Sequence, residues 1–388
     1  MLNTIPRAKL HGPALLAPLA RYLIAVGATV GLLVTSAIPV RAAAQKHHHY
    51  KLIDIGTFGG PASEVNLGSG NDTGNYAMVL NSGGSVTGLA ETSTPDPFFP
   101  NCFTNNCVIA HTFVWKDGAK LDVGALPGGG SSAGNWISSN GLIAGYSENG
   151  EIDPLDGLPE VRATLWAHGR IIDLGTLPEG GFESLANAVN AKGQVVGIAS
   201  NEVPDPNPMT GPGGPHATQT RAFVWQDGAM QDLGTLGTGT DAQAILIDAR
   251  GQVVGWSYVN SVPASNCGFA LVTGSFIWDN QNGMRDLGNL GGTCTTASAM
   301  NNSGQVVGFS NLPGDVIVHG FLWDRGLFQD LGGSLGGEGQ GPFAMNEHGE
   351  AVGLALLPGN PATAPIHAVL WRHVGDLVDH GLPVQVFP

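Results

Sequence analysis

Short apolar stretches separated by Gly, Asp and Asn dominate the chain after residue 45. The segment 222–258, AFVWQDGAMQDLGTLGTGTDAQAILIDARGQVVGWSY, shows the pattern most clearly. It contains four runs of strand length, AFVW, AMQDLG, AQAILID and QVVGWS, and each is bounded by Gly or Asp. Such runs are typical of β-strands joined by turns. Because no helical period of useful length follows Gln45, the pattern predicts an all-β protein.

The same unit recurs in register along the chain. The Asp of its second run recurs at intervals of 44 to 68 residues. The copies are Asp54, Asp122, Asp173, Asp232, Asp286 and Asp330, with a degenerate copy at Asp376. The turn between the third and fourth runs is stricter, with Gly three and seven residues after its first residue. That first residue is Asn81, Ser138, Asn190, Asp248, Asn301 or Asn346. These coincidences indicate an internal repeat.

Each recurring residue has a structural explanation. An Asn, Asp or Ser side chain at the start of a turn can accept a hydrogen bond from the backbone two residues on, and the later Gly supplies a positive φ. The Gly within VVG suits the close approach of a neighbouring backbone. The Asp of DLG is a tempting catalytic residue, since a ring of carboxylates would shift pKa values. Its presence in every unit favours a structural role instead, as an acceptor of backbone N–H groups in the Gly-rich turn.

A four-stranded unit of about fifty residues, repeated six times, predicts a β-propeller of about six blades rather than a solenoid. The first unit begins near Tyr50 and lacks its AFVW run, whereas the chain ends with HAVLW around Trp371. We expect this C-terminal strand to complete the first blade and close the ring, which would remove exposed sheet edges. The alternative count is seven, with a partial blade over residues 368–378.

The connectors between strands are of two kinds. The QDG and ARG turns are tight and share one face of such a propeller. The Gly-rich GTLGG connectors and the connectors between units share the other face, and only the latter are long and variable. Long irregular connectors on a rigid scaffold are where binding and catalytic residues usually lie. The long-connector face is therefore predicted to carry any ligand site.

Few residues of that face suggest chemistry. Phe98 and Phe99 are suited to stacking on a sugar or a peptide, or to plugging the core. The following connectors offer carboxylates and an imidazole, namely Asp153, Asp156, Glu160, Glu202, Asp205 and His216. Carboxylates in an exported loop could bind calcium. Their spacing is not that of an EF-hand, so the favoured interpretation is a solvated loop.

Composition and motifs exclude several functions. The formal net charge is −15 and charged residues make up 12% of the chain. Nucleic-acid binding needs a basic stripe, and none is visible. No G-x-S-x-G, H-E-x-x-H, Walker or dinucleotide fingerprint occurs in the chain after residue 44. The sequence thus identifies no catalytic residue and no cofactor.

Residues 1–44 are typical of an export signal, because Arg7, Lys9 and Arg21 precede an uncharged run and small residues end at Ala44. An uncleaved anchor is the alternative. Residues 45–388 are then one propeller domain. Cysteines of an exported chain predict disulfides. We expect Cys102 to pair with Cys107 and Cys267 with Cys294, although other pairings are possible.

The unit W..G…DLGTL…N..GQVVG resembles the HAF repeat of bacterial extracellular proteins, named after a His-Ala-Phe tripeptide. The tripeptide is approximated by His111-Thr112-Phe113, His319-Gly320-Phe321 and His367-Ala368-Val369. The resemblance covers Tyr50 to Val378. It implies a secreted, periplasmic or cell-surface bacterial protein, and it supplies no catalytic residues.

Three functions remain open on the sequence alone. The leading hypothesis is an exported, non-enzymatic propeller that binds an extracellular ligand, such as a glycan or a cell-surface protein. The first alternative is a polysaccharide lyase or hydrolase in which Asp153, Glu202 and His216 serve as acid and base. The second is a passive envelope component. Nucleic acid is not an expected partner.

Overall fold

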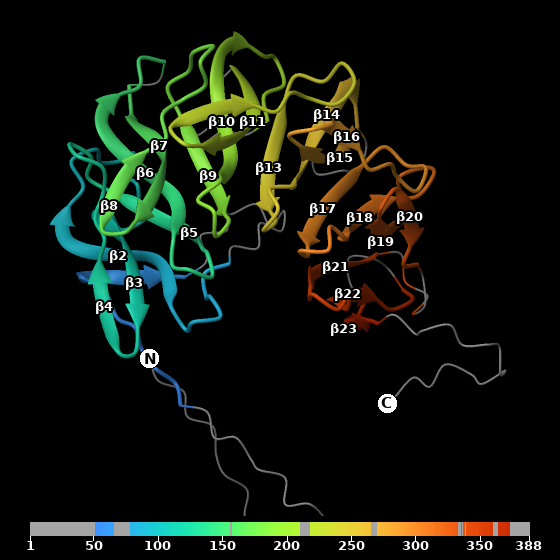
Figure 1. Cartoon of the computed structure of the whole chain (residues 1–388), viewed down its shortest axis with the longest axis horizontal. Coiled ribbons are helices and arrows are strands. Elements are labelled where there is room, and N and C mark those ends of the chain that lie inside the picture. Colours follow the sequence, from blue (N-terminus) through green and yellow to red (C-terminus); the bar gives the residue numbers. More distant parts are fainter. Residues whose placement is uncertain are drawn as a thin grey trace, which may run out of the picture. The chain divides into compact units, whose positions relative to one another are not determined.

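The computed structural model describes residues 51–65, 78–155, 157–209, 218–264, 270–332, 335, 337, 339–359 and 364–372. Their regular secondary structure consists of 23 strands in six antiparallel sheets, which follow one another in chain order (Figure 1). The predicted all-β propeller of six blades is confirmed. The chain divides into Met1–Ile53 and Asp54–Pro388, and all six sheets belong to the second unit. The predicted signal segment, residues 1–44, lies outside the described residues.

Hydrogen-bonded neighbours within a sheet are always consecutive in the chain. The first sheet consists of β1 (Gly59–Glu64), β2 (Val86–Pro95), β3 (Val108–Lys116) and β4 (Ala119–Asp122). The second consists of β5 (Ser132–Ile137), β6 (Ile143–Ile152), β7 (Pro159–Ala167) and β8 (Arg170–Asp173). The third consists of β9 (Ser184–Val189), β10 (Val195–Pro204), β11 (Thr218–Gln226) and β12 (Ala229–Asp232).

The last three sheets repeat this order. The fourth consists of β13 (Ala242–Ile247), β14 (Val253–Pro263), β15 (Leu271–Asp279) and β16 (Gly283–Asp286). The fifth consists of β17 (Thr295–Met300), β18 (Val306–Asn311), β19 (Val318–Asp324) and β20 (Leu327–Asp330). Among the described residues the sixth has three strands, β21 (Gln340–Met345), β22 (Ala351–Leu356) and β23 (Ile366–Trp371).

The Gly of the VVG motif lets two backbones meet in every sheet. At Gly197 a Cβ would clash with the carbonyl oxygen of Leu185 on the preceding strand, and the other five copies meet the same obstacle. In four of the six sheets the third strand places a Phe opposite this Gly. Phe223 faces Gly197 in this way, and its side chain is fully buried. The Gly is therefore required by backbone packing, as the sequence predicts.

The Asn-type turns also form as predicted. Asn190 Oδ1 accepts the N–H groups of Lys192 and Gln194 at 3.0 and 3.1 Å. The turn also reaches the following sheet, because Asn190 Nδ2 donates to the carbonyl oxygen of Asp248 at 3.0 Å. Asn81 and Asn301 make the equivalent inter-sheet bonds. These bonds join successive sheets on the tight-turn face.

The predicted structural role of the DLG aspartates is confirmed. In each described copy, Oδ1 accepts the N–H of the Gly two residues later at 2.7 to 2.8 Å. The carboxylates of three of these aspartates also bind a basic side chain on the neighbouring third strand. These pairs are His111 with Asp122, Arg221 with Asp232 and His319 with Asp330. The His of the HAF-like tripeptide thus pairs with the Asp of DLG.

The prediction that HAVLW completes the first blade is wrong. This run forms β23, which pairs with β22 as the third strand of the sixth sheet, while the first sheet has its own third strand, β3. The reason is the phase of the repeat. Each sheet begins with the AQAILID-type run and not with AFVW. No strand pairing joins the first and sixth sheets among the residues described. Of the proposed seventh blade, residues 368–371 belong to the sixth sheet and residues 373–378 lie outside the described ranges.

Candidate functional site

The long connectors follow the second strand of each sheet. Because strands alternate in direction, these connectors lie at the same end of their sheets as the Gly-rich connectors that enter the next sheet. Main-chain bonds confirm this, since Tyr258 near the exit of β14 donates to the carbonyl oxygen of Asp241 at the entry to β13. We call this end the connector face.

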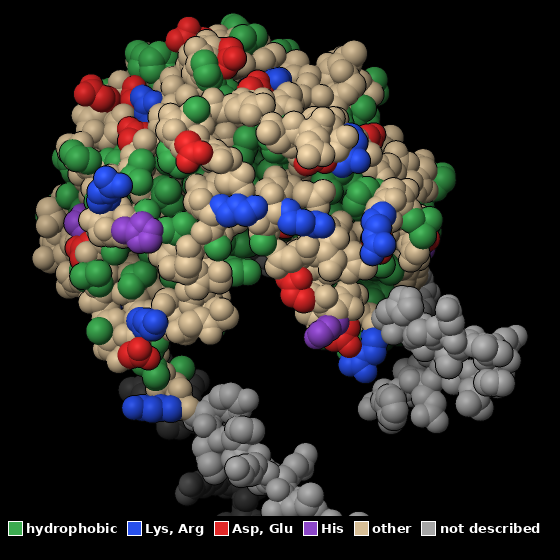
Figure 2. All heavy atoms as spheres, viewed as in Figure 1, with side chains coloured by type: hydrophobic (Ala, Val, Ile, Leu, Met, Phe, Trp, Pro, Cys, Tyr) green, Lys and Arg blue, Asp and Glu red, His purple; other side chains and the backbone are tan. Residues whose placement is uncertain are grey.

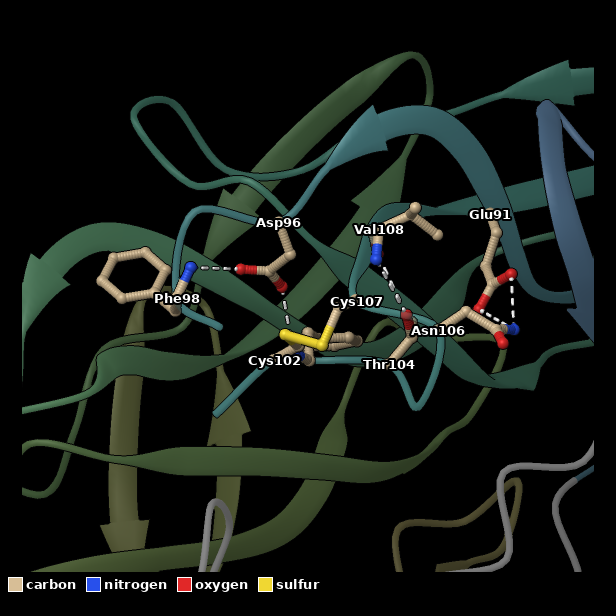
Figure 3. The surroundings of a disulfide bond; sticks show 9 residues. Glu91, Asp96, Phe98, Cys102, Thr104, Asn106, Cys107 and Val108 are labelled. Atoms are coloured by element: carbon tan, nitrogen blue, oxygen red, sulfur yellow. Dashed lines mark hydrogen bonds between the residues drawn. A yellow bond between two sulfur atoms is a disulfide. The ribbon is translucent and has the colours of Figure 1, made fainter. Parts of the chain in front are cut away.

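The connector between β2 and β3 is clamped by a disulfide (Figure 3). Cys102 and Cys107 are bonded, as the sequence predicts. Asp96 holds the first half of the loop, because Oδ1 accepts the N–H of Phe98 at 2.9 Å and Oδ2 accepts the N–H of Phe103 at 3.0 Å. Asn106 Nδ2 donates to both carboxylate oxygens of the buried Glu91 at 3.0 Å. Both halves of the loop are therefore tied to the first sheet.

Three aromatic residues of this connector lie in different environments. Phe99 is 77% exposed, whereas Phe98 is half-buried. Phe103, which the sequence reasoning did not single out, packs its ring 5.5 Å from the ring of Tyr146 in the second sheet. Burial raises the pKa of Tyr146 to about 12, with a further contribution from Glu64, so this hydroxyl stays neutral. Phe103 thus anchors the loop while Phe99 remains available on the surface.

The surface of the clamped connector is uncharged. Asp96 is the only charged residue between Thr92 and Val108, and it is buried. The exposed residues are Phe99, prolines and amides, including Asn101 and Asn105. Figure 2 shows one face of the whole protein, on which a few charged side chains are spread among predominantly neutral groups. This composition suits an uncharged ligand better than an ionic one.

Two of the carboxylates predicted as ligand-face candidates, Asp153 and Asp205, occupy a position that recurs in the first three units. Asp96, Asp153 and Asp205 are each the eighth residue after the Gly of VVG. All three are buried, and each accepts the N–H of the residue two positions later through Oδ1. The solvated-loop interpretation is therefore wrong for Asp153 and Asp205. Counting forward from that Gly would have shown the recurrence in the sequence.

Asp205 contacts a second carboxyl group that the sequence did not reveal. Its side chain hydrogen-bonds to Asp241, which precedes β13 and is fully buried. Asp241 Oδ1 accepts the N–H groups of Met209 and Thr220 at 3.1 and 2.7 Å, and Oδ2 accepts the Thr240 hydroxyl at 2.7 Å. Asp241 therefore joins the connector of the third sheet to the first strand of the fourth.

Burial and hydrogen bonding separate the pKa values of these two groups. Burial raises the pKa of Asp241 to about 6, although N–H donors oppose the shift. For Asp205, burial acts in the same direction, but the hydrogen bonds from Thr240, Asn207 and Asp241 outweigh it and lower the pKa. Tyr258 lies nearby, and burial together with the charge of Asp241 raises its pKa to about 12. Separated carboxyl pKa values can mark an acid–base pair, but Asp241 has no exposed surface on which a substrate could act.

The remaining candidates are not brought into one cleft. Glu160 is buried in an ion pair with Arg162, and Glu202 is exposed beside Gly180 of its own sheet. Asp156 and His216 lie outside the described residues. Glu148 of β6, which the sequence did not single out, is buried beside the residues that precede β5. Burial raises its pKa, while N–H groups of Ser131 and Gly130 oppose the shift and the nearby Asp96 adds to it.

Within the described ranges, no three His, Cys, Asp or Glu side chains group as metal ligands. No helix in the described part of the chain is long and apolar enough to cross a bilayer. Cys294 is in a disulfide, whereas Cys267, its predicted partner, lies outside the described residues.

Comparisons with known proteins concern architecture. No family model matches the chain, and no curated protein matches it. Among solved structures, acylaminoacyl peptidase from Pyrococcus horikoshii is 16% identical, with 68% of this chain and 40% of that chain covered and a TM-score of 0.36. A puromycin-hydrolyzing peptidase from Mycobacterium tuberculosis is 13% identical, with 77% and 46% covered and a TM-score of 0.41.

One similar structure is a propeller domain alone. The β-propeller domain of the Trilobed protease from Pyrococcus furiosus is 12% identical, with 79% of this chain and all of that chain covered and a TM-score of 0.30. The chain thus spans less than half the length of the two complete peptidases that it resembles. At these identities the likeness extends to the propeller fold and not to activity.

Proposed function

We propose that the protein is an exported, non-enzymatic β-propeller that binds an uncharged extracellular ligand, a saccharide in the first place, through the clamped connector 96–107. The observation that carries this proposal is Phe99, which is 77% exposed on a loop held by a disulfide, by Asp96 and by Phe103. A loop held in one conformation loses little entropy on binding. An aromatic side chain presented in this way is a typical binding anchor.

The ligand class follows from the groups around Phe99. A ring face can stack on the C–H groups of a sugar, and the neighbouring exposed amides of Asn101 and Asn105 can exchange hydrogen bonds with hydroxyl groups. No ionised side chain of this connector is exposed. The export signal and the HAF-like repeat support an extracellular location, and both remain predictions. The turn roles of Asp153 and Asp205 support a binding protein over a hydrolase.

The test is a glycan array with the exported protein, followed by calorimetry on any sugar that binds. We expect Phe99→Ala to weaken binding at least about tenfold, the usual effect at an aromatic anchor. Leu327→Ala is the matched control, because Leu327 is 58% exposed beside the tight turn between β19 and β20 on the opposite face. An array without binding, or equal affinities of the wild type and Phe99→Ala, would refute the proposal.

A further inference from the structure

The sixth sheet lacks, among the described residues, the element that the other five sheets have. In those sheets a four-residue fourth strand ends in the DLG-type Asp and pairs with the third strand. On β23 no such strand is described, and Ile366 and Leu370 are 63% and 52% exposed. At the position of Leu370, the corresponding Ile277 of the fourth sheet is only 1% exposed.

After β23 the sequence holds only the degenerate copy at Asp376, outside the described residues, whereas a complete copy of the signature occurs at the other end of the described chain. Asp54-Ile55-Gly56 follows the pattern of Asp122-Val123-Gly124. Asp54 Oδ1 accepts the N–H of Gly56 at 2.8 Å, as in the five complete sheets. Yet residues 51–57 form no strand, and Asp54 is exposed. A fourth-strand turn is thus present without a third strand beside it.

The contact between the turn at Gly56 and the first sheet is already formed. In the second sheet, Ile171 of β8 lies against Gly124, which belongs to the connector between β4 of the first sheet and β5. Lys120 occupies the same register on β4 as Ile171 on β8. It lies against Gly56 and donates to the carbonyl oxygen of Thr57 at 2.6 Å. The turn at Gly56 therefore approaches the first sheet as its counterpart approaches the second.

We propose that Asp54-Ile55-Gly56 is a strap that closes onto β23, with Asp54 opposite Val369, so that the sixth sheet gains its fourth strand and joins the first. Two contacts follow from the register. The N–H of Ile55 donates to the carbonyl oxygen of Ala368, as Val123, Leu174, Leu233, Leu287 and Leu331 donate at the same position. Asp54 binds His367, as Asp122 binds His111. His367 is exposed in the open arrangement.

Hydrogen exchange of the exported protein tests the main-chain contact. We expect the Ile55 amide to exchange at least about a hundredfold more slowly than in a free peptide, as buried sheet amides do, with Val123 as the internal reference. Deletion of residues 373–388 should leave this protection intact. An Ile55 amide that exchanges freely while Val123 is protected would overturn the proposal. Protection found only in a dimer would also overturn it, because the occupant would then be a second copy.

Thermal denaturation of substituted variants at pH 6 tests the side-chain contact. Asp54→Asn and His367→Gln should each lower the Tm, and the double variant should lower it no further than the larger single effect. His111→Gln with Asp122→Asn is the matched pair, since that contact is observed at 2.8 Å. The contact between Asp54 and His367 would be excluded if their two losses in Tm were strictly additive while those at His111 and Asp122 were not.

Discussion

The two ends of the sheets are joined by different chemistry. On the tight-turn face, the recurring link between successive sheets is a neutral bond, such as Asn190 Nδ2 to the carbonyl oxygen of Asp248. The exposed Glu347 adds a charged link between the fifth and sixth sheets. On the connector face, the third and fourth sheets are linked by Asp241, which gathers backbone N–H groups of Met209 and Thr220 and contacts Asp205. Amide–carbonyl bonds do not change between pH 4 and 8, whereas a buried carboxyl pair does. The comparison therefore assigns pH sensitivity to the face that carries the proposed ligand site.

The largest effect should come from removing the Asp241 side chain. Asp241→Ala leaves the N–H groups of Met209 and Thr220 without their acceptor in a buried site. Unsatisfied buried donors cost about 1–3 kcal/mol each, so we expect a loss of about 4 kcal/mol in the free energy of unfolding. Urea denaturation at pH 5 measures it. Asp241→Asn is the control, because its carbonyl oxygen can still accept the two N–H groups. Equal losses in both variants would show that these hydrogen bonds do not hold the junction.

The pH dependence of stability is the second effect. The pKa of Asp241 is raised to about 6 in the folded protein, above its value of about 3.9 in an unfolded chain. The contribution of Asp241 to the free energy of unfolding is therefore complete below pH 4 and is lost as the pH rises through 6. This contribution amounts to about 3 kcal/mol. The raised pKa of Glu148 acts in the same direction. The lowered pKa of Asp205 acts oppositely, and its contribution is lost as the pH falls below 4.

Urea denaturation between pH 4 and 8 checks this sign. The wild type should lose stability from pH 5 to 7.5, and Asp241→Asn should flatten the curve, because an amide can donate to Asp205 at every pH. Asp227→Asn is the matched control, since Asp227 is an exposed acid in the turn between β11 and β12 on the opposite face. If the wild type were more stable at pH 7.5 than at pH 5, the assignment of the proton to Asp241 would be wrong.

The difference between the faces also decided what the sequence could predict. The turn residue Asn190, the Gly of VVG and the DLG aspartates recur at constant spacing, so their roles could be inferred before the structure. Asp241 could not be found in this way. The equivalent positions hold Ser131, Glu183, Cys294 and Gly339, so no pattern marks it. Its raised pKa comes mainly from burial, and the contact with Asp205 of the preceding sheet adds to the shift.

Two errors had physical causes of the same kind. A repeat has the same period whichever run is placed first, so the sequence could not say that sheets begin with AQAILID. Only the hydrogen-bonded neighbours assign HAVLW to the sixth sheet. The recurrence of Asp153 and Asp205 was hidden because the connectors vary in length after that position. The disulfide between Cys102 and Cys107 was predictable, because two cysteines separated by only four residues meet each other more easily than either meets a distant cysteine.

The disulfide of the connector face should contribute less than Asp241. Replacing Cys102 and Cys107 by Ser opens a loop of only a few residues, and the chain-entropy relation gives about 2 kcal/mol for such a loop. We expect this loss from urea denaturation, without a change in its pH dependence. Because the clamp holds Phe99, the same variant should also bind the ligand of the proposed site more weakly. Unchanged ligand affinity would mean that Asp96 and Phe103 suffice to order the connector.

The smallest effect should come from the tight-turn face. Asn190→Asp keeps the Oδ1 acceptor that the turn requires, as the natural Asp248 shows in the next sheet. It removes the Nδ2 donor, which bonds to the carbonyl oxygen of Asp248 in the next sheet and to Gln194 Oε1 in the same turn. We expect a loss of about 1 kcal/mol at pH 7, whereas Asn190→Ala should cost more because the turn also loses its acceptor. The loss in Asn190→Ala should be the same at pH 5 and pH 8, since no titrating group is removed. A loss that varies with pH as steeply as the stability of the wild type would mean that the two faces do not differ in the way their sheets are joined.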